Sequence, residues 1–510
     1  ISKVEPEEYI HFDVENKIIE CLSNISLQSV KELEIDFNTD GCNLDKSSTN
    51  HIWPIIQCRI INVENTKPIV VGIYKGIQKP NNHNAFFEKF VADITAIVSN
   101  RGITFHNRKV QICLRCFIVD APARAFILNH CSHASSKPCS KCKISGVYTE
   151  GRFVFNNIQH SLRTDDEYIR RLDEDHHREG ESPLSLLPIS MVSQVPFEHM
   201  HLVCLGVMKK LLTAWVYGKY SRLSKLSGRY LSVINTRLNI LRKYCPSDFA
   251  RHPRLLDICS KFKATEFRQF LLYTGPVVMY GLLNEDVYKH FLFLHAAIRV
   301  LVSKSPLRQH LSFAEIALQK FVLRCANLYG PTFATYNVHG LLHLADDVRR
   351  FGNLDSFSAF AYENNMYIFR KCCRKPGLPL QQFFNRMTEQ QIHGTNNTCN
   401  NASSIRTSIL RNNDTNCPQY RKINFNNILL SIDTYDNCCI LHDGSICIVT
   451  EISRESNSFR LAVNRFLSVA DFYDVGMASS CFQVYKCATL SSERFYVSLN
   501  EVHAKCYRMP

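Results

Sequence analysis

Two aspartates stand at or near the ends of separate predicted strands. Asp40 ends residues 31–40, where apolar and polar residues alternate as in a half-buried strand, and Asp120 ends the apolar run 110–120. Carboxylates that converge at strand ends hold Mg²⁺ or Mn²⁺, hard cations that prefer oxygen ligands. A two-metal site activates water or a 3′-hydroxyl in phosphodiester chemistry. The alternative is structural, because Asp before Gly forms turns and Asp before Ala-Pro caps helices.

A third acid is not identified by periodicity. Glu363 is one of several glutamates on predicted helices, and most such side chains are solvated. Glu266 is a competing candidate on the same grounds.

A cysteine pair has the spacing of a metal knuckle. Cys139 and Cys142 form a Cys-x-x-Cys motif, in which two thiolates bind one Zn²⁺. Possible histidine partners are His133, His160, His176 and His177, with His199 and His201 further along the chain. We predict that the His176–His177 pair completes this zinc site. Zinc would tie together a loop with little core of its own. Free or buried thiols and a redox pair remain alternatives.

A histidine pair at helical spacing is a second metal candidate. His339 and His343 lie four positions apart, so a helix presents them on one face together with Asp346. The Glu of a metalloprotease motif is missing. Packed or surface histidines are therefore the favoured interpretation.

The elements around the two aspartates predict a mixed sheet. Strands are expected at 31–40, 51–62 and 67–76, a helix follows with apolar residues at 86–97, and the strand 110–120 comes next. Three consecutive strands followed by a crossover helix give a mixed sheet covered by helices. This is the element order with which an RNase-H-like domain begins.

The remainder of the chain changes character several times. Residues 199–350 have helical periodicity almost throughout, and short strands return near the C-terminus. The predicted organisation is a lead-in helix (1–30), a first core segment (31–135), a zinc-knuckle segment (136–198), a helical insertion (199–350), the end of the core (351–392), a polar linker (393–425) and a small β domain (426–510). The fold class is mixed α+β.

Net charge and composition indicate which classes of partner the protein binds. The 510 residues carry a net charge of +14, which favours a polyanion such as nucleic acid. Basic residues are dense early in the helical insertion, and we nominate Lys209, Lys210 and Arg222 as DNA contacts, although a solvated helix face explains them almost as well. The 22 cysteines are scattered and no signal peptide precedes them, which favours reduced thiols. We expect no membrane span, since no run of about 18 apolar residues occurs.

Nine stretches in chain order carry a family resemblance over about residues 33 to 390. They read IDFNTDGCNL with IWPI, KPIVVGIYKG, FIVDAPARAF, CSKC, EDHHREGESPL, HMHLVCLGVMKKLL, KATEFRQFLLYTGPVV, NVHGLLHLADDVRRFG and SAFAYEN. The chain resembles a family of arthropod and cnidarian transposase-domain proteins, distantly similar to the plant CACTA-type (En/Spm) transposases.

The resemblance implies an RNase-H-like fold interrupted by a helical insertion before the last acid. It implies that Asp40, Asp120 and Glu363 are the catalytic acids that bind the two Mg²⁺ or Mn²⁺ ions. An Asp-x-x-His motif of the family reads Glu198-His199-Met200-His201 here, with Glu in place of Asp. Residues 364–368 and 135–138 also depart from the family pattern, which is typical of a decaying copy.

The expected function is therefore that of a nuclear DNA transposase, which cleaves phosphodiester bonds and transfers strands at transposon ends. Its expected partners are transposon-end and target DNA, and self-association into a homo-oligomer is left open. The alternative is a catalytically decayed or domesticated transposase that acts as a DNA-binding or chromatin-associated protein.

Overall fold

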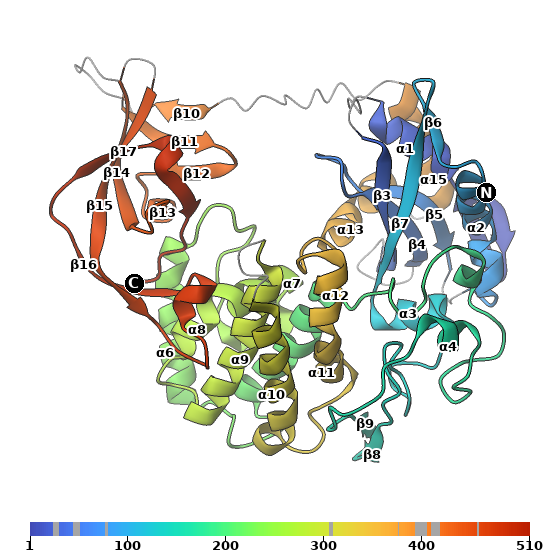
Figure 1. Ribbon diagram of the computed structural model, residues 1–510, viewed down its shortest axis with the longest axis horizontal. Helices are drawn as coiled ribbons and strands as arrows, with labels where there is room; N and C mark the ends of the chain where they lie inside the picture. The colour runs from blue at the N-terminus through green and yellow to red at the C-terminus, as the bar shows by residue number, and fades with distance from the viewer. Residues whose placement is uncertain are drawn as a thin grey trace. The chain divides into compact units, whose positions relative to one another are not determined.

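The computed structural model describes residues 1–23, 30–43, 51–76, 80–304, 310–375, 377–392, 405–409, 419–455 and 458–510. The chain forms two compact units, each built from two segments (Figure 1). Unit 1 comprises residues 1–207 and 301–396, and unit 2 comprises residues 208–300 and 397–510. The fold is mixed α+β, with a helical region and a C-terminal β domain, as the sequence predicts.

Unit 1 contains a twisted sheet that includes all four strands predicted around the aspartates. Within the described residues it has seven strands in the order β1-β2-β5-β4-β3-β7-β6. Their bounds are β1 (Ser2–Val4), β2 (Glu7–His11), β3 (Glu32–Asn43), β4 (His51–Ile60), β5 (Ile69–Lys75), β6 (Ile103–Phe105) and β7 (Arg108–Val119). Strands β3, β4 and β5 form an antiparallel meander, whereas β7 runs parallel to β3.

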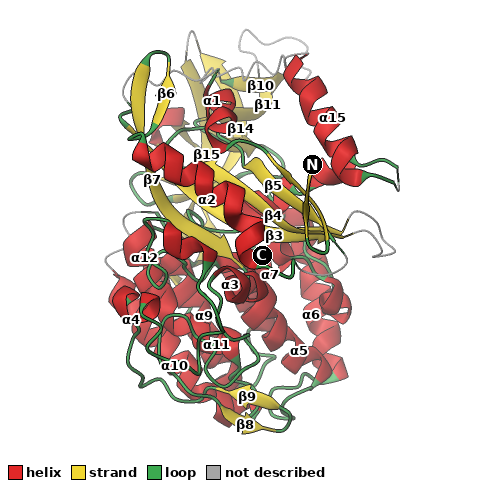
Figure 2. Ribbon diagram, turned by 90° about the vertical axis from the view of Figure 1, so that its right-hand side faces the viewer, coloured by secondary structure: helices red, strands yellow, loops and turns green. Residues whose placement is uncertain are grey.

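Helices cover both faces of this sheet, because its strands are apolar on both sides (Figure 2). On one face α1 (Val14–Leu22) and α2 (His83–Ser99) pack against β3, β4, β5 and β7, around Phe37, Phe90 and Phe117. On the other face α14 (Tyr367–Cys372) and α15 (Pro379–Ile392) pack on β4 and β5 around Ile55 and Phe369. Helix α2 is the crossover that allows β7 to pair in parallel with β3.

The prediction of a lead-in helix over residues 1–30 is only partly correct. Residues 14–22 form α1, but β1 and β2 precede it as an antiparallel hairpin. Strand β2 then pairs with β5 and extends the sheet. The apolar pair Tyr9 and Ile10 points to opposite faces, and both side chains are buried, which a strand achieves and an isolated helix turn does not.

Every regular element that the structure describes between residues 199 and 350 is a helix, as predicted. The π-helix η2 (His199–Met208) runs into α5 (Lys209–Tyr217). The others are α6 (Gly228–Leu241), η3 (Arg242–Tyr244), η4 (Leu256–Lys261), α7 (Ala264–Gln269), η5 (Phe270–Thr274), α8 (Gly275–Met279), α9 (Glu285–Val302), α10 (Leu311–Tyr329), α11 (Tyr336–Gly340), η7 (Leu341–His343) and α12 (Leu344–Phe351). They do not form a single insertion, because residues 208–300 belong to unit 2 and residues 301–350 to unit 1.

The β domain of unit 2 begins earlier than predicted. Its strands are β10 (Arg406–Ile409), β11 (Tyr420–Phe425), β12 (Ile428–Ser431), β13 (Cys438–Leu441), β14 (Ile446–Glu455), β15 (Ser458–Asp471), β16 (Tyr485–Leu490), β17 (Phe495–Ser498) and β18 (Val502–Lys505). Strands β10 and β11 fall within the predicted linker 393–425, whose residues 393–404 and 410–418 lie outside the described part of the chain. A turn at Asp443-Gly444 joins β13 to β14, with Gly444 at a φ of 85°.

Polar side chains join the β domain to the helices of the same unit. The carboxylate of Asp436, which is fully buried, accepts hydrogen bonds from the backbone N–H and the hydroxyl of Ser247. Lys505 forms ion pairs with Asp436 and with Asp248. Arg299 on α9 donates to the carbonyl of Phe482 at 2.7 Å. The β domain and the helices of residues 208–300 are therefore parts of one compact unit, where the sequence predicted a separate module.

One helical segment has the composition of a membrane span. The helix His199–Tyr217 is long and apolar enough to cross a membrane, but 61% of its most apolar stretch is buried inside the structure. The core helix of a soluble protein has the same length and composition, so this helix is weak evidence for a membrane span.

An ion pair inside the sheet links the two central strands to a distant loop. Asp36 on β3 is fully buried and accepts a hydrogen bond from Arg115 on β7. Arg115 also donates to the carbonyl of Phe351 and to the hydroxyl of Ser356. Burial raises the pKa of Asp36 to about 6, although Arg115 and Cys116 lower it. The pair therefore holds the loop after α12 against the sheet.

We predict that Arg115→Met destabilises the protein by about 3–5 kcal/mol, since it leaves a buried carboxylate without its partner. The double variant Asp36→Asn/Arg115→Met should recover much of this loss. The pKa of the Asp36 carboxyl is higher in the folded protein than its value near 4 in the unfolded chain. The folded state therefore loses stability as the pH rises from the unfolded pKa to the folded pKa. The Arg115→Met penalty should therefore be larger at pH 8 than at pH 5 in urea unfolding. An equal loss in the single and double variants contradicts this account.

Candidate functional site

The two predicted strand-end aspartates meet because β3 and β7 are parallel neighbours. In their register Thr39 lies beside Val119, so the next residues along the two strands are Asp40 and Asp120. Asp40 falls where β3 stops pairing with β7, three residues before β3 itself ends. Asp120 directly follows β7. The structure therefore brings these two carboxylates to one edge of the sheet.

Both aspartates also have the local roles that such residues have in turns and caps. Asp120 is the N-cap of α3 (Ala121–Ile127), and its carboxylate accepts from the N–H of Ala123 at 2.8 Å. Asp40 accepts from the N–H of Gly41 at 2.7 Å. Each contact fixes the direction of one carboxylate and leaves its other oxygen for a further partner.

Glu363 lies on α13 (Phe360–Asn365), which polar contacts fasten to the sheet. Asn365 donates to the side-chain oxygen of Gln57 on β4 at 2.8 Å and to the carbonyl of Pro68 at 3.3 Å. Gln57 contacts Asn38 on β3, which in turn donates to the carbonyl of Ile118 on β7. This buried chain of amides runs across the three strands and holds the Glu363 helix against them. Asn365 thus has a structural role, because its amide holds α13 against β4.

Electrostatics connects all three predicted acids. Burial raises the pKa of Asp40 to about 7; His201 lowers it, whereas the charges of Asp120 and Glu363 raise it. Glu363 is exposed, while Asp40 is half-buried. Carboxylates that repel one another in this way form a natural place for a cation. Glu266, the competing candidate, instead forms a buried ion pair with Arg254 in unit 2.

A histidine and a buried glutamate complete this carboxylate site, and neither was among the nominated site residues. His201 on η2 forms an ion pair with Glu198 at 2.7 Å, and its Nε2 lies 3.9 Å from Oδ2 of Asp40. Glu198 also accepts from the N–H of Met200 at 2.7 Å and of Ala359 at 3.1 Å. Burial alone lowers the pKa of His201, but Glu198, Asp40 and Asp120 raise it to about 10. The family-like Glu198–His201 motif gave the only sequence signal for this pair.

A cavity of about 230 Å³ opens beside Asp120 and His201. Its wall includes Glu198, Arg124 and Tyr336. Arg124 is buried and donates to the carbonyl of Val195 at 2.6 Å, which fixes the chain just before Glu198. The site therefore has an accessible volume next to the acids.

The predicted Cys-x-x-Cys knuckle lies against His339 and His343. The sequence alone favours packed or surface side chains for these two histidines. Cys139 Sγ lies 3.4 Å from Nε2 of His343, and Cys142 Sγ lies 3.3 Å from Nε2 of His339. The two Nε2 atoms are 3.3 Å apart. All four side chains are buried, and their donor atoms lie within 4.8 Å of one another. Two thiols and two imidazoles so arranged could bind a metal such as zinc.

The backbone around the knuckle is held independently of any metal. The N–H of Lys141 donates to Sγ of Cys139 at 3.4 Å, and the Arg163 guanidinium donates to the carbonyls of Cys139 and Cys142. The buried Lys141 ammonium pairs with Asp347 on α12 at 2.7 Å. These contacts preorganise the four donors.

His176 and His177 do not complete the knuckle, which corrects the predicted ligand set. His339 and His343 approach the two thiols instead, since the helical turns of α11 and η7 place both rings on one face. His176 lies in a second buried group with His130 and Cys131, whose donor atoms also fall within 4.8 Å of one another. The ring of His177 packs edge-on against Tyr168.

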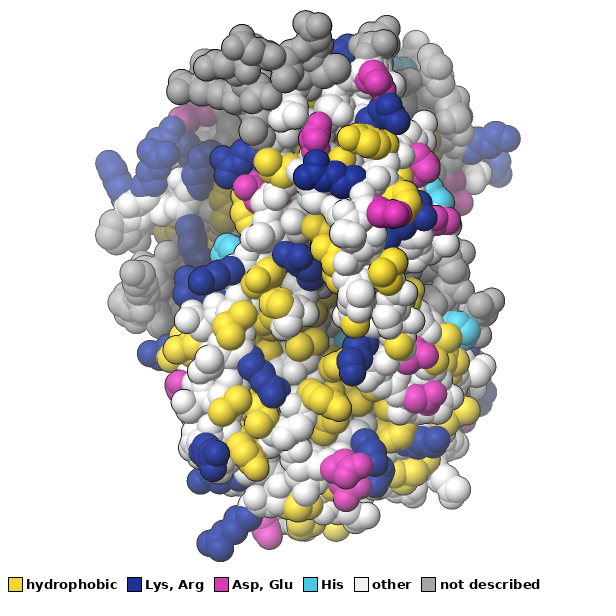
Figure 3. All heavy atoms as spheres, turned by 90° about the vertical axis from the view of Figure 1, so that its left-hand side faces the viewer, with side chains coloured by type: hydrophobic (Ala, Val, Ile, Leu, Met, Phe, Trp, Pro, Cys, Tyr) yellow, Lys and Arg dark blue, Asp and Glu magenta, His cyan; other side chains and the backbone are white. Residues whose placement is uncertain are grey.

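The nominated DNA contacts lie at the surface of unit 2. Lys209 and Arg222 are exposed, and Lys210 is half-buried with its ammonium 5.2 Å from the ring centre of Tyr220. Figure 3 shows one face of the molecule, on which Lys and Arg side chains are spread among apolar ones. Among the described side chains of this face, Lys and Arg lie singly or in small groups, with several together near one upper edge.

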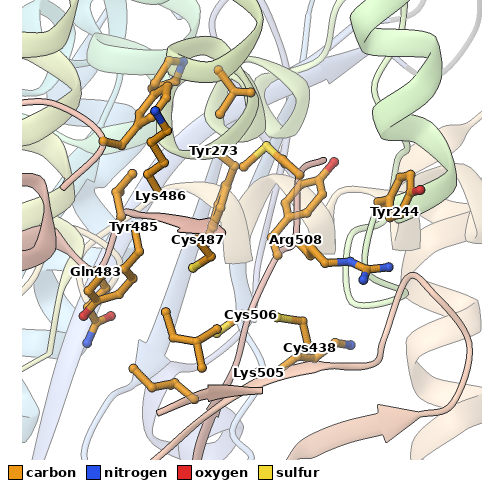
Figure 4. A pocket seen from close by; sticks show the side chains of 18 of the residues that line it. Tyr244, Tyr273, Cys438, Gln483, Tyr485, Lys486, Cys487, Lys505, Cys506 and Arg508 are labelled. Carbon is orange, nitrogen blue, oxygen red and sulfur yellow. The ribbon is translucent and has the colours of Figure 1, made fainter. Parts of the chain in front are cut away.

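Unit 2 contains a larger cavity, of about 600 Å³, which the sequence did not predict (Figure 4). Helices α8 and α9 form one side of it and the β domain forms the other. Its lining includes Tyr244, Tyr273, Arg299, Lys486 and Arg508, and none of the described lining residues is acidic. None of the predicted catalytic acids lies there.

We predict that metal removal loosens unit 1. A chelator, or Cys142→Ser, should lower the melting temperature by roughly 5–10 °C, because ligand binding to the folded state is part of its stability. Cys113→Ser, at a half-buried cysteine of β7 outside both groups, is the matched control and should keep its metal and its melting temperature. Wild-type protein that holds no metal and melts unchanged with chelator contradicts the prediction.

Comparison with known proteins adds one match. Residues 401–510 match the family model of a domain of unknown function (DUF8592), which includes the described strands of the β domain. No curated protein matches the chain.

Proposed function

We propose that this protein is a transposase-like polynucleotidyl transferase whose acids are Asp40, Asp120 and Glu363. The observation that carries the proposal is the edge of the sheet, where Asp40 and Asp120 follow parallel neighbouring strands and the charge of Glu363 acts on Asp40. The substrate class is DNA at transposon ends and target sites, and the location is the nucleus. A homo-oligomer fits the joining of two DNA ends.

The strand order supports an RNase-H-like core. The meander β3-β4-β5, the crossover helix α2 and the parallel partner β7 follow the order with which such domains begin. Asp40 lies on β3, the first strand of the meander, and Asp120 directly follows β7, the parallel partner of β3. Glu363 lies on α13, which packs on the sheet. These positions support the assignment of the three acids that the family resemblance implies.

The donor set fits hard divalent cations. Three carboxylates offer oxygen ligands. Burial is the main reason that the pKa of Asp40 is raised, and the charges of Asp120 and Glu363 add to it; Mg²⁺ or Mn²⁺ bound there would offset that repulsion. Bound there, such ions would activate a water or 3′-hydroxyl nucleophile and stabilise the leaving oxygen. The Cys139, Cys142, His339 and His343 group would hold a structural zinc, with tetrahedral N and S ligands.

The residues around the acids have separate tasks in this proposal. Glu198 keeps His201 protonated and oriented, so that its imidazolium stands beside Asp40 and can donate to a phosphate oxygen. The hydrogen bond from the Ala359 N–H to Glu198 couples this pair to the start of α13. The cavity beside Asp120 gives the scissile phosphate a place to approach.

A second candidate is a decayed or domesticated transposase that binds DNA or chromatin without turnover. His201 favours this candidate, because its imidazolium already balances part of the carboxylate charge without a metal ion. The two candidates differ in whether the acids bind metal.

Manganese binding separates the two candidates. We predict that Mn²⁺ binds to the wild type at micromolar to millimolar concentration, and that Asp40→Asn, Asp120→Asn and Glu363→Gln each weaken it at least about tenfold, which corresponds to 1.4 kcal/mol. The same variants should abolish Mn²⁺-dependent cleavage of a DNA substrate. Glu389→Gln, at an exposed glutamate paired with Arg386, is the control. Equal Mn²⁺ affinity in all variants would leave only the binding-protein candidate.

DNA affinity tests the basic surface. We predict that reversal of Lys209, Lys210 and Arg222 to Glu weakens duplex DNA binding and makes the salt dependence shallower, by about 0.9 in log–log slope for each lost phosphate contact. The control reverses Lys289, Arg421 and Arg460, which form surface ion pairs in the same unit. Net charge changes equally in both variants, so an equal effect would exclude a specific role for the first three residues.

A further inference from the structure

A second group of metal-binding side chains lies outside both the acid site and the knuckle. His130 and His176 are at most 1% exposed, and Cys131 between them is half-buried. One donor atom from each residue lies within 4.8 Å of the other two. The two imidazole rings stack, with centres 4.6 Å apart. Cys131 Sγ lies 3.9 Å from Nδ1 of His176, which is 45 residues away in the chain, and donates to the carbonyl of Lys137 at 2.9 Å.

The hydrogen bonds of the two rings leave one nitrogen of each for a ligand. His130 Nδ1 lies 2.6 Å from the carbonyl of Cys131, and His176 Nδ1 lies 2.7 Å from the carbonyl of Lys137. A carbonyl can only accept, so in both rings Nδ1 carries the proton and Nε2 has a free lone pair. Both Nε2 atoms are buried without a hydrogen-bond partner. Metal-bound histidines usually donate their second N–H to just such an acceptor.

The backbone holds the two segments in place. The N–H of Cys131 donates to the carbonyl of His176 at 2.8 Å, and the N–H of Arg178 donates to the carbonyl of Asn129 at 3.1 Å. His130 and His177 form an antiparallel bridge between the same segments. The donors are therefore positioned by main-chain pairing and not by the side chains alone.

Neighbouring positive charges are balanced by acids. The Arg163 guanidinium lies 2.8 Å from a carboxylate oxygen of Asp173. The Lys137 ammonium pairs with Asp173 and with Asp175. A cation bound by the three donor atoms would therefore not be repelled by an unpaired charge on Arg163 or Lys137.

We infer that His130, Cys131 and His176 form a second metal site, which takes a borderline transition-metal ion such as Zn²⁺ and leaves one coordination position open. Imidazole and thiolate ligands select such metals over Mg²⁺ or Ca²⁺. Three protein ligands with an open fourth position distinguish this site from the closed four-ligand knuckle. Because Cys131 is half-buried, the fourth ligand can be water or another exchangeable group.

Metal content of the purified full chain tests the inference. We expect about two zinc ions per wild-type chain and about one in His130→Asn and in His176→Asn. His177→Asn is the matched control, since it changes the neighbouring histidine, whose ring lies outside the group and packs on Tyr168. This control should keep about two ions. One ion in the wild type, or two in His176→Asn, overturns the second site.

Reconstitution with Co²⁺ gives a second readout that does not depend on folding yield. Thiolate-to-cobalt absorption should fall by about one third in His176→Asn, because one of three metal-bound thiolates loses its metal. Cys139→Ser should instead retain the ion held by Cys131. Absorption in His176→Asn equal to that of His177→Asn contradicts the proposal, whether or not the acids bind metal.

Discussion

The parallel pairing of β3 with β7 is the constraint on which the acid site depends. The pairing places two aspartates, 80 positions apart, at one edge of a sheet without any direct bond between them. It requires a crossover, which α2 supplies, and a covering layer on each face. The helix that carries Glu363 is held against the sheet by the hydrogen bond from Asn365 to Gln57, and the charge of Glu363 acts on Asp40. A one-residue slip of β3 would turn Asp40 to the opposite face.

Hydrogen bonds and ion pairs between residues far apart in the sequence hold the irregular segment between β7 and η2 beside that edge of the sheet. This segment has few regular elements, although apolar side chains such as Ile127, Leu184 and Val195 belong to the core of unit 1. Asp347 on α12 accepts from the N–H of Phe197 at 2.8 Å and also binds Lys141 within the knuckle. One buried carboxylate thus connects the knuckle to the residue that precedes Glu198. The orientation of His201 therefore depends on contacts far from its own helix.

Local periodicity predicted the strands of the meander and β7, because each has enough apolar residues to show its period. It also supplied Asp40 and Asp120, since the end of a strand is a local property. It could not choose the partners of Cys139 and Cys142, because His339 lies 197 positions from Cys142 and only tertiary structure joins them. The nearer pair His176–His177 was chosen by proximity in sequence. The hairpin of residues 2–11 was missed because each of its strands is too short to show a period.

The four-donor group also has a topological consequence. It joins residues 139–142 to residues 339–343, while the polypeptide between them leaves unit 1 at about residue 207 and returns at about residue 301. If these four side chains bind a metal, a cut in the chain between residues 207 and 301 would not separate the two segments, because the metal would still join them. In the unfolded chain, the same metal link would close a loop of about 200 residues and reduce the conformational freedom of the chain. Insertions within residues 208–300 would therefore leave this link between the two segments of unit 1 in place.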